Sequence, residues 1–288
     1  MARELKARSW LFVPGDSERK LAKAAGAGAD AVIVDLEDAV APEAKPAARA
    51  LAHEWLQGGS AGRWVRINAL DTPWWRDDLA AVMPAAPAGI MLPKAAGPGQ
   101  LRLLSAELDA LEQRHAIPPG ATRILPLVSE TPAAAISIPA YAGDSLQRLA
   151  GLTWGAEDLS AAIGATRKRT PAGEWADAFR FVRAQVLLTA HACGVAAVDT
   201  LHADFRDGAG LQRIAAESRA DGFHGMLAIH PDQVPIINAA FAPSEAELAE
   251  ARAIVELFAA NPGAGALSLD GRMVDQPHLA QAKRLLER

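Results

Sequence analysis

Short apolar runs alternate with helix-forming stretches along most of this 288-residue chain, and this alternation constrains the fold more than any other feature. Eight runs are expected to be strands, at residues 9–13, 31–36, 64–68, 89–93, 123–128, 148–153, 196–200 and 226–229. Alanine-rich stretches at 18–27, 43–57, 74–82, 100–114, 132–140, 174–193 and 211–220 are expected to be the helices between them. Such repetition predicts parallel strands joined by right-handed crossovers.

Eight units of this kind predict a closed (β/α)8 TIM barrel, whose usual length is about 250 residues. A doubly wound open sheet is the alternative that the same pattern allows. Two further helices are expected at 233–240 and 245–260, so we assign residues 1–260 to a barrel catalytic domain. The sequence predicts an α/β protein in either case.

A separate C-terminal segment is expected at residues 261–288. It opens with the hinge-like Asn-Pro-Gly-Ala-Gly and continues with a strand-like Leu-Ser-Leu, a turn at Asp270-Gly271 and a helix from near Gln276. From the residues alone, a frayed tail or one more packing helix is the simpler interpretation.

Composition excludes several classes of protein. The chain is 50% hydrophobic and 22% charged, and its one cysteine is Cys193. A disordered chain would hold fewer apolar residues, and a disulfide framework or a cysteine-based zinc site needs several cysteines.

The formal net charge of −5 argues against nucleic acid as a partner, because phosphate binding needs a clustered excess of Lys and Arg. The chain has neither an apolar run of signal-peptide length near its N-terminus nor a stretch of about 18 uncharged apolar residues. We therefore expect a cytoplasmic protein that spans no membrane. The negative net charge does not exclude a small anionic ligand that is bound by a few local positive charges.

Carboxylates follow several of the expected strands. In a TIM barrel the carboxyl ends of the strands form the active site, so these side chains are candidates for function. Asp35-Leu36-Glu37-Asp38 ends the second strand, Lys94 ends the fourth, Glu130 the fifth and Asp158 the sixth. An oxygen-only set without cysteine suits Mg²⁺ or Mn²⁺, and Glu130 with Asp158 is the pair that we favour as ligands. The alternative is that each of these residues caps the helix that follows it.

Arg66 lies in the third strand and is expected to reach the same rim. Its planar fork suits two-pronged binding of a substrate carboxylate, while a buried ion pair with Glu37 or Asp38 is the structural alternative. Among the histidines, His230 at the end of the eighth strand is the most interesting. The chain has no HExxH zinc motif and no GxxxxGK[ST] loop.

Several motifs in order resemble the citrate lyase beta-subunit family of the HpcH/HpaI aldolase superfamily. They are RSWLFVPGDSERKLAKAAGAGADAVIVDLEDAVAPEAK, WVRINA, LPLVSETPAA, GAEDLSAAIG, VDTLHADFRDGAGL, GFHGMLAIHPDQV and DGRMVDQPHL. The resemblance runs from Arg8 to about Leu286. It implies a (β/α)8 barrel, a homotrimer or hexamer, and Mg²⁺-dependent cleavage or formation of a carbon–carbon bond beside an acyl thioester.

The resemblance also implies roles for four catalytic residues. Glu130 in SETP and Asp158 in GAEDL correspond to the family's metal ligands, and Arg66 corresponds to its carboxylate-binding arginine. Related malyl-CoA lyases have a C-terminal lid whose aspartate reaches the active site of a neighbouring subunit. Asp275 in DGRMVDQPH matches that aspartate best, and Asp270 is the alternative alignment.

One residue departs from the family pattern, because Met226 stands where lysine is usual. If that lysine holds an anionic part of the thioester carrier, its loss affects the affinity for coenzyme A or the identity of the carrier.

The chemistry and the resemblance together predict a lyase for citramalyl-CoA, malyl-CoA or a similar 3-hydroxyacyl thioester, giving acetyl-CoA and a 2-keto acid. Mg²⁺ is the expected cofactor, with Mn²⁺ as a substitute, and coenzyme A enters as part of the substrate. Three alternatives stay open: the beta subunit of a multi-subunit citrate lyase, a non-catalytic acyl-CoA-binding barrel, and an aldolase acting on free 2-keto acids.

Overall fold

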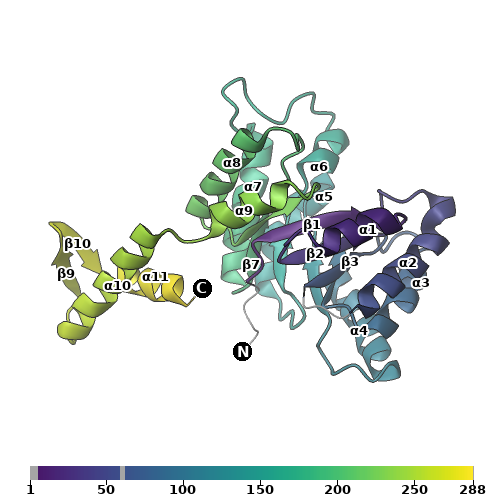
Figure 1. The fold of residues 1–288 in the computed structure, drawn as a ribbon, viewed down its shortest axis with the longest axis horizontal. Helices are drawn as coiled ribbons and strands as arrows, with labels where there is room; N and C mark the ends of the chain where they lie inside the picture. Colours follow the sequence, from purple (N-terminus) through teal and green to yellow (C-terminus); the bar gives the residue numbers. More distant parts are fainter. Residues whose placement is uncertain (1–5, 59–61, 288) are drawn as a thin grey trace. The chain divides into compact units, whose positions relative to one another are not determined.

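The computed structural model describes residues 6–58 and 62–287. The chain divides into two compact units, Met1–Phe241 and Ala242–Arg288. Figure 1 shows the first in purple to green and the second in yellow-green to yellow. Each unit is described separately below.

Eight parallel strands form the sheet of the first unit, in the order β5-β4-β3-β2-β1-β8-β7-β6. Parallel bridges Ile124–Leu149 and Leu127–Thr153 join β5 to β6 and bring the two ends of the sheet together. The prediction of a (β/α)8 TIM barrel is therefore confirmed, and the open-sheet alternative is excluded. The strands are β1 Ser9–Pro14, β2 Ala31–Asp35, β3 Arg63–Arg66, β4 Gly89–Leu92, β5 Arg123–Pro126, β6 Gly151–Thr153, β7 Ala196–Asp199 and β8 Gly225–Ala228.

Helices follow the strands as the alternation predicts (Figure 1). The α-helices of the first unit are α1 Glu18–Ala25, α2 Lys45–Gln57, α3 Trp75–Val82, α4 Pro98–Arg114, α5 Pro132–Ser137, α6 Ala156–Ala162, α7 Asp177–Ala192, α8 Gly208–Asp221 and α9 Gln233–Phe241. Short 3-10 helices are η1 Pro42–Ala44, η2 Met83–Ala85 and η3 Ile138–Gly143.

Two helical segments differ from the expectation. The stretch at 132–140 divides into α5 and η3 near Pro139, which has no N–H for an α-helical hydrogen bond. The short helix α6 was not among the expected helices, because its few residues give no clear helical period. A helix at this place entered only through the alternative that Asp158 is a helix cap.

Alternating side chains along each strand form two apolar layers. Trp10 and Ile33 lie in a cluster inside the barrel, where the rings of Trp10 and Trp64 meet edge to face at 5.1 Å. Leu11 and Val34 belong to the larger cluster outside the barrel wall, between strands and helices. Because successive residues of a strand point to opposite faces, buried runs such as Ala-Val-Ile-Val serve both layers.

The second unit contains α10 Glu245–Ala260, the antiparallel hairpin β9 Ala266–Leu269 and β10 Arg272–Asp275, and α11 Gln276–Leu286. Asp270 and Gly271 both have positive φ, at 50° and 78°, as a two-residue hairpin turn requires. Ile254 and Phe258 of α10 cluster with Val274 and Ala282. The tail is thus an ordered unit rather than a frayed end.

Along the chain, the boundary between the two compact units falls between Phe241 and Ala242. The sequence predicted this boundary at residue 261. The difference arises because α10 buries its apolar face against the hairpin and α11, so it belongs with the tail. A helical period shows that α10 is amphipathic but does not show which partner covers it. The role of residues 261–288 as a lid stays a prediction.

Candidate active site

The carboxyl ends of the barrel strands bring charged side chains together at one rim. Asp35 ends β2, Arg66 ends β3, Lys94 follows β4, and Glu130 follows β5. Asp35 and Glu130 are each 2% exposed, so burial at this rim amplifies the interactions between charges. The residues that the sequence placed at the end of different strands therefore share one site.

Glu130 is held by the backbone and not by the helix that follows it. The N–H of Lys94 donates to Glu130 Oε2, while Thr131 caps α5 by accepting from the N–H of Ala134 at 3.1 Å. The other carboxylate oxygen, Oε1, is buried and has no hydrogen-bond partner among the described residues. The helix-cap alternative for Glu130 is therefore not what the structure shows.

Burial raises the pKa of Glu130 to about 8. The nearby charges of Glu37 and Asp158 act in the same direction, while the Lys94 N–H and Arg66 oppose them. A buried carboxyl group surrounded by other acids is costly to ionise unless a cation compensates its charge.

Gly155 lies between the two predicted metal ligands. A Cβ atom at this position would lie 3.6 Å from Glu130 Cγ and 3.9 Å from Asp158 Oδ2. The backbone N–H of Gly155 donates to Ser129 Oγ at 3.0 Å. Glycine thus lets the loop after β6 approach the loop after β5. Within the described part of the chain, no hydrogen bond or ion pair engages the Asp158 carboxylate, so its capping of α6 is not observed.

The donor set fits a divalent cation. In residues 6–58 and 62–287, no group of three or more His, Cys, Asp or Glu side chains is arranged to hold a metal ion. Mg²⁺ needs only one or two protein carboxylates and keeps positions for water or substrate oxygens. The unpartnered Oε1 of Glu130, beside a second carboxylate, is the group that such a cation would satisfy.

Arg66 is fixed by two acids of the β2 end. Its Nε and Nη2 donate to the two carboxylate oxygens of Asp35 at 2.8 and 2.6 Å, and Nη1 lies 3.1 Å from Glu37 Oε2. The guanidinium carbon lies 4.9 Å from the centre of the Phe12 ring. These charges raise the pKa of Arg66 despite its burial. The ion pair with Glu37 that the sequence allowed is present, while Asp38 pairs with Lys94 instead.

Lys94 links three of the rim acids. Its Nζ contacts Glu37 and lies 3.2 Å from Asp38 Oδ2, while its backbone N–H binds Glu130. Lys94 has a φ of 49°, a left-handed conformation that costs a non-glycine residue about 1 kcal/mol. Its ion pairs and the hydrogen bond to Glu130 hold this conformation in place.

Asp199, at the end of β7, is a buried acid that sequence reasoning missed. It accepts from Trp154 Nε1 at 2.7 Å, Ser218 Oγ at 2.6 Å and Arg183 Nε at 2.9 Å. Its position directly after an apolar strand was the available signal, as for Asp35. Because these partners occupy both carboxylate oxygens of Asp199, we assign this residue a structural role at the rim.

The remaining predicted residues lie in other elements of the chain. Asp275 caps α11 in the second unit, and Asp270 lies in the hairpin turn. His230 stacks on Phe205, with ring centres 4.9 Å apart, in the loop after β8. Met226 is the second residue of β8 and is 1% exposed in the outer apolar layer, away from the carboxyl end of its strand.

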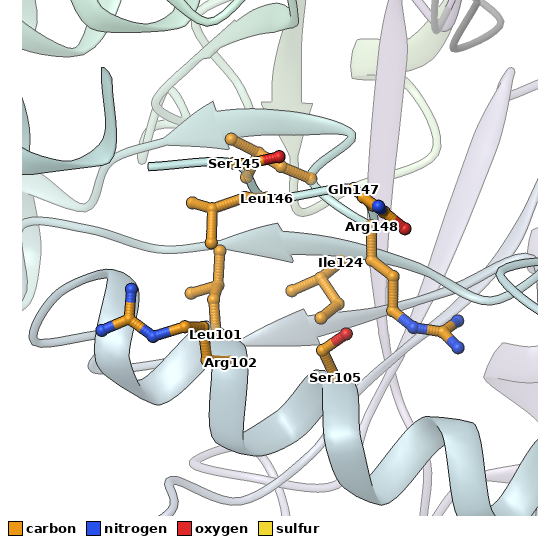
Figure 2. Close-up of a pocket in the computed structure, with 9 residues that line it drawn as sticks. Leu101, Arg102, Ser105, Ile124, Ser145, Leu146, Gln147 and Arg148 are labelled. Carbon is orange, nitrogen blue, oxygen red and sulfur yellow. The ribbon is translucent and has the colours of Figure 1, made fainter. Parts of the chain in front are cut away.

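Two hollows of the first unit are lined by residues other than the rim acids. Figure 2 shows a cavity of about 150 Å³, where Leu101, Arg102 and Ser105 of α4 face the segment 145–148. A larger one of about 570 Å³ lies beside α7 and α8. The arginines of the first are already paired, Arg102 with Asp144 and Arg148 with Glu112, so we do not assign a ligand to it.

Comparisons with known proteins show which proteins the chain resembles. The family described as HpcH/HpaI aldolase/citrate lyase matches residues 8–231. A citrate lyase subunit beta-like protein of Mycobacterium tuberculosis is 39% identical over 280 residues, which cover 97% of this chain and 94% of the relative. A (3S)-malyl-CoA thioesterase of Cereibacter sphaeroides is 35% identical over 284 residues, which cover 97% and 93%.

A solved structure shows the same fold along the whole chain. It is the protein CitE of Mycobacterium tuberculosis in complex with magnesium, acetoacetate and coenzyme A, with a TM-score of 0.77 and 36% identity. The match covers 98% of each chain. In the described residues, the helices are too short or too polar to cross a membrane.

Proposed function

The chain belongs to the HpcH/HpaI aldolase/citrate lyase family and is a lyase, and from this premise we propose that it cleaves or forms the carbon–carbon bond of a 3-hydroxyacyl thioester. The substrate class includes citramalyl-CoA and malyl-CoA, and the products of cleavage are acetyl-CoA and a 2-keto acid. The unpartnered, buried Oε1 of Glu130 beside Asp158 is the observation that carries this proposal.

Glu130 and Asp158 would hold the cation, Mg²⁺ or Mn²⁺. When bound, such an ion polarises hydroxyl and carbonyl oxygens and lowers the pKa of the hydroxyl group that must lose its proton. The complex of the related CitE protein with magnesium, acetoacetate and coenzyme A supports this choice. Glu130 is buried and accepts from the N–H of Lys94, so this ligand would be in place before the substrate arrives.

Arg66 would bind the carboxylate of the 2-hydroxy acid portion. Asp35 and Glu37 already engage Nε, Nη2 and Nη1, and a guanidinium has five N–H groups, so N–H groups remain for the substrate. Because its partners fix the guanidinium, little entropy is lost when the substrate binds. Lys94 keeps Glu37 and Asp38 compensated, so these acids do not repel an anionic substrate.

Asp275 would exchange a proton with the terminal acyl carbon, as the family resemblance implies. In the synthesis direction its carboxylate accepts a proton from the methyl group of acetyl-CoA, and in the cleavage direction the acid returns that proton to the enolate carbon. We propose that residues 261–288 act as the lid and that the protein works as a homotrimer or hexamer, in which Asp275 serves a neighbouring subunit.

The substrate is tested with the purified protein alone. Malyl-CoA, citramalyl-CoA and citryl-CoA are each incubated with Mg²⁺, and the 2-keto acid and free thiol are measured separately. We expect a keto acid without a matching release of thiol from malyl-CoA or citramalyl-CoA, and loss of activity when EDTA is added.

Other products would indicate a different function. Release of thiol without a keto acid would indicate hydrolysis, the activity that names the relative from Cereibacter sphaeroides. Activity only with a carrier-bound citryl thioester would indicate a citrate lyase beta subunit, and binding without turnover an acyl-CoA-binding barrel. Cleavage of free hydroxy keto acids would indicate an aldolase. A cytoplasmic location fits each of these functions.

A further inference from the structure

The predicted lid acid has a histidine partner in the second unit. The Nδ1 atom of His278 lies 2.5 Å from Asp275 Oδ1, to which it donates when it carries a proton. Without that proton, Nδ1 instead accepts from the backbone N–H of Asp275, at 3.3 Å, in the capping box at the start of α11. The side chains of Asp275 and His278 are 33% and 46% exposed, so both can reach a ligand. An Asp–His pair of this kind is a common way to orient and charge a proton-transfer group.

The other charged groups around His278 have partners of their own. Glu250 of α10 pairs with Arg272 of β10 at 2.8 Å, and Glu247 accepts from the N–H of its N-cap Ser244 at 2.7 Å. Both glutamates line the same small hollow as His278 between α10 and α11. Of these three acids, Asp275 is the one that contacts the imidazole.

We propose that His278 is a positioning residue for proton transfer, holding the Asp275 carboxylate ionised and in one orientation at the start of α11. This inference rests on the function proposed above. The transfer is balanced: the Asp275 carboxylate takes a proton from the acetyl-CoA methyl group, the C–H electron pair remains on the enolate, and a solvent proton replaces the one removed. The hydrogen bond from His278 also lowers the pKa of Asp275.

Two substitutions separate this role from helix capping. His278→Gln keeps a side chain that suits the third position of a capping box, but its amide carries no charge. His278→Ala removes the capping partner and the charge together. Both variants are measured in the full chain, beside the wild type and Asp275→Asn.

The assay follows exchange of the methyl protons of acetyl-CoA for deuterium in D₂O, with Mg²⁺ and a 2-keto acid present. We expect His278→Gln to melt at the wild-type temperature, bind acetyl-CoA with the same affinity and exchange at least about tenfold more slowly.

The failure of this inference is distinguishable from the failure of the proposed function. If His278→Gln exchanges at the wild-type rate, His278 is only a helix cap and the inference is wrong. If the wild type does not exchange, or Asp275→Asn exchanges normally, the proposed role of Asp275 fails and the inference fails with it.

Discussion

The guanidinium of Arg66 donates to both carboxylate oxygens of Asp35, at 2.8 and 2.6 Å. The two residues are partners across neighbouring strands β2 and β3. This pair fixes the arginine before any substrate arrives, and it places a permanent positive charge among the acids of the rim. The proposed substrate contact and a buried ion pair therefore involve the same side chain.

We expect Arg66→Lys to lower kcat/KM by at least about tenfold, mainly through KM, because an ammonium group cannot form the two-pronged contact. Steady-state kinetics with varied thioester concentration measure this effect. Arg148→Lys is the matched control, since Arg148 forms a similar two-pronged pair with the buried Glu112, at 2.7 and 2.6 Å, before the amino end of β6. An unchanged KM in Arg66→Lys would contradict the assignment.

Glu130→Ala and Asp158→Ala should each reduce Mg²⁺-dependent turnover by at least about a hundredfold. Both variants should fold, because neither side chain belongs to the apolar layers. Turnover and Mg²⁺ titration by calorimetry test this expectation. Glu157→Gln alters an exposed acid next to Asp158 and should behave as the wild type. Near-normal turnover in either alanine variant would show that the metal ligands are wrongly assigned.

Gly155→Ala should weaken Mg²⁺ binding by roughly threefold to tenfold while changing the free energy of unfolding by less than about 1 kcal/mol. The added methyl group would lie 3.1 Å from Leu127 Cδ2, a side-chain tip that can shift, and beside both ligands. Calorimetric Mg²⁺ affinity and urea unfolding measure the two effects. Gly143→Ala, whose methyl group meets no atom within 4 Å, is the control. Equal Mg²⁺ affinity in both variants would argue against a cation between these loops.

Acid should destabilise the barrel through Glu112. Burial would raise the pKa of Glu112, but hydrogen bonds from Arg148 and from the N–H groups of Thr122 and Gly120 outweigh it and lower this pKa to about 2. Because the pKa is lower in the folded state than the usual value of about 4.3, the stabilisation is complete above that value. It is lost as the pH falls towards 2, and it amounts to on the order of 3 kcal/mol.

Urea unfolding between about pH 5 and pH 2.5 measures this loss. Glu112→Gln should be less stable than the wild type near neutral pH, because the buried Arg148 loses its charged partner, and should show a shallower decline in acid. If the free energy of unfolding of Glu112→Gln falls with pH as steeply as that of the wild type, other carboxylates cause the acid sensitivity.

Much of the site follows from strand ends. Once the barrel was predicted, Glu130, Asp158 and Arg66 had to lie at one rim, and the structure places them there. The positions of strand ends did not predict which side chains these residues contact. Asp35, rather than Glu37 or Asp38, takes the fork of Arg66, and this depends on register between β2 and β3.

Other features depended on packing between segments distant in sequence. The acid Asp199 is engaged by Trp154, Arg183 and Ser218, and no local pattern predicts such a set. The left-handed Lys94 is held by contacts to the loops after β2 and β5. Neither a period nor a motif encodes such contacts.

The sequence by itself determined the eight βα units, the barrel and the order of the rim residues, because periodicity and motifs are local properties of the chain. The tertiary structure decided which oxygen of Glu130 is left without a partner, which acid fixes Arg66, and that α10 packs with the C-terminal hairpin. These outcomes depend on burial and on distances between residues far apart in sequence, and only the folded chain sets those quantities.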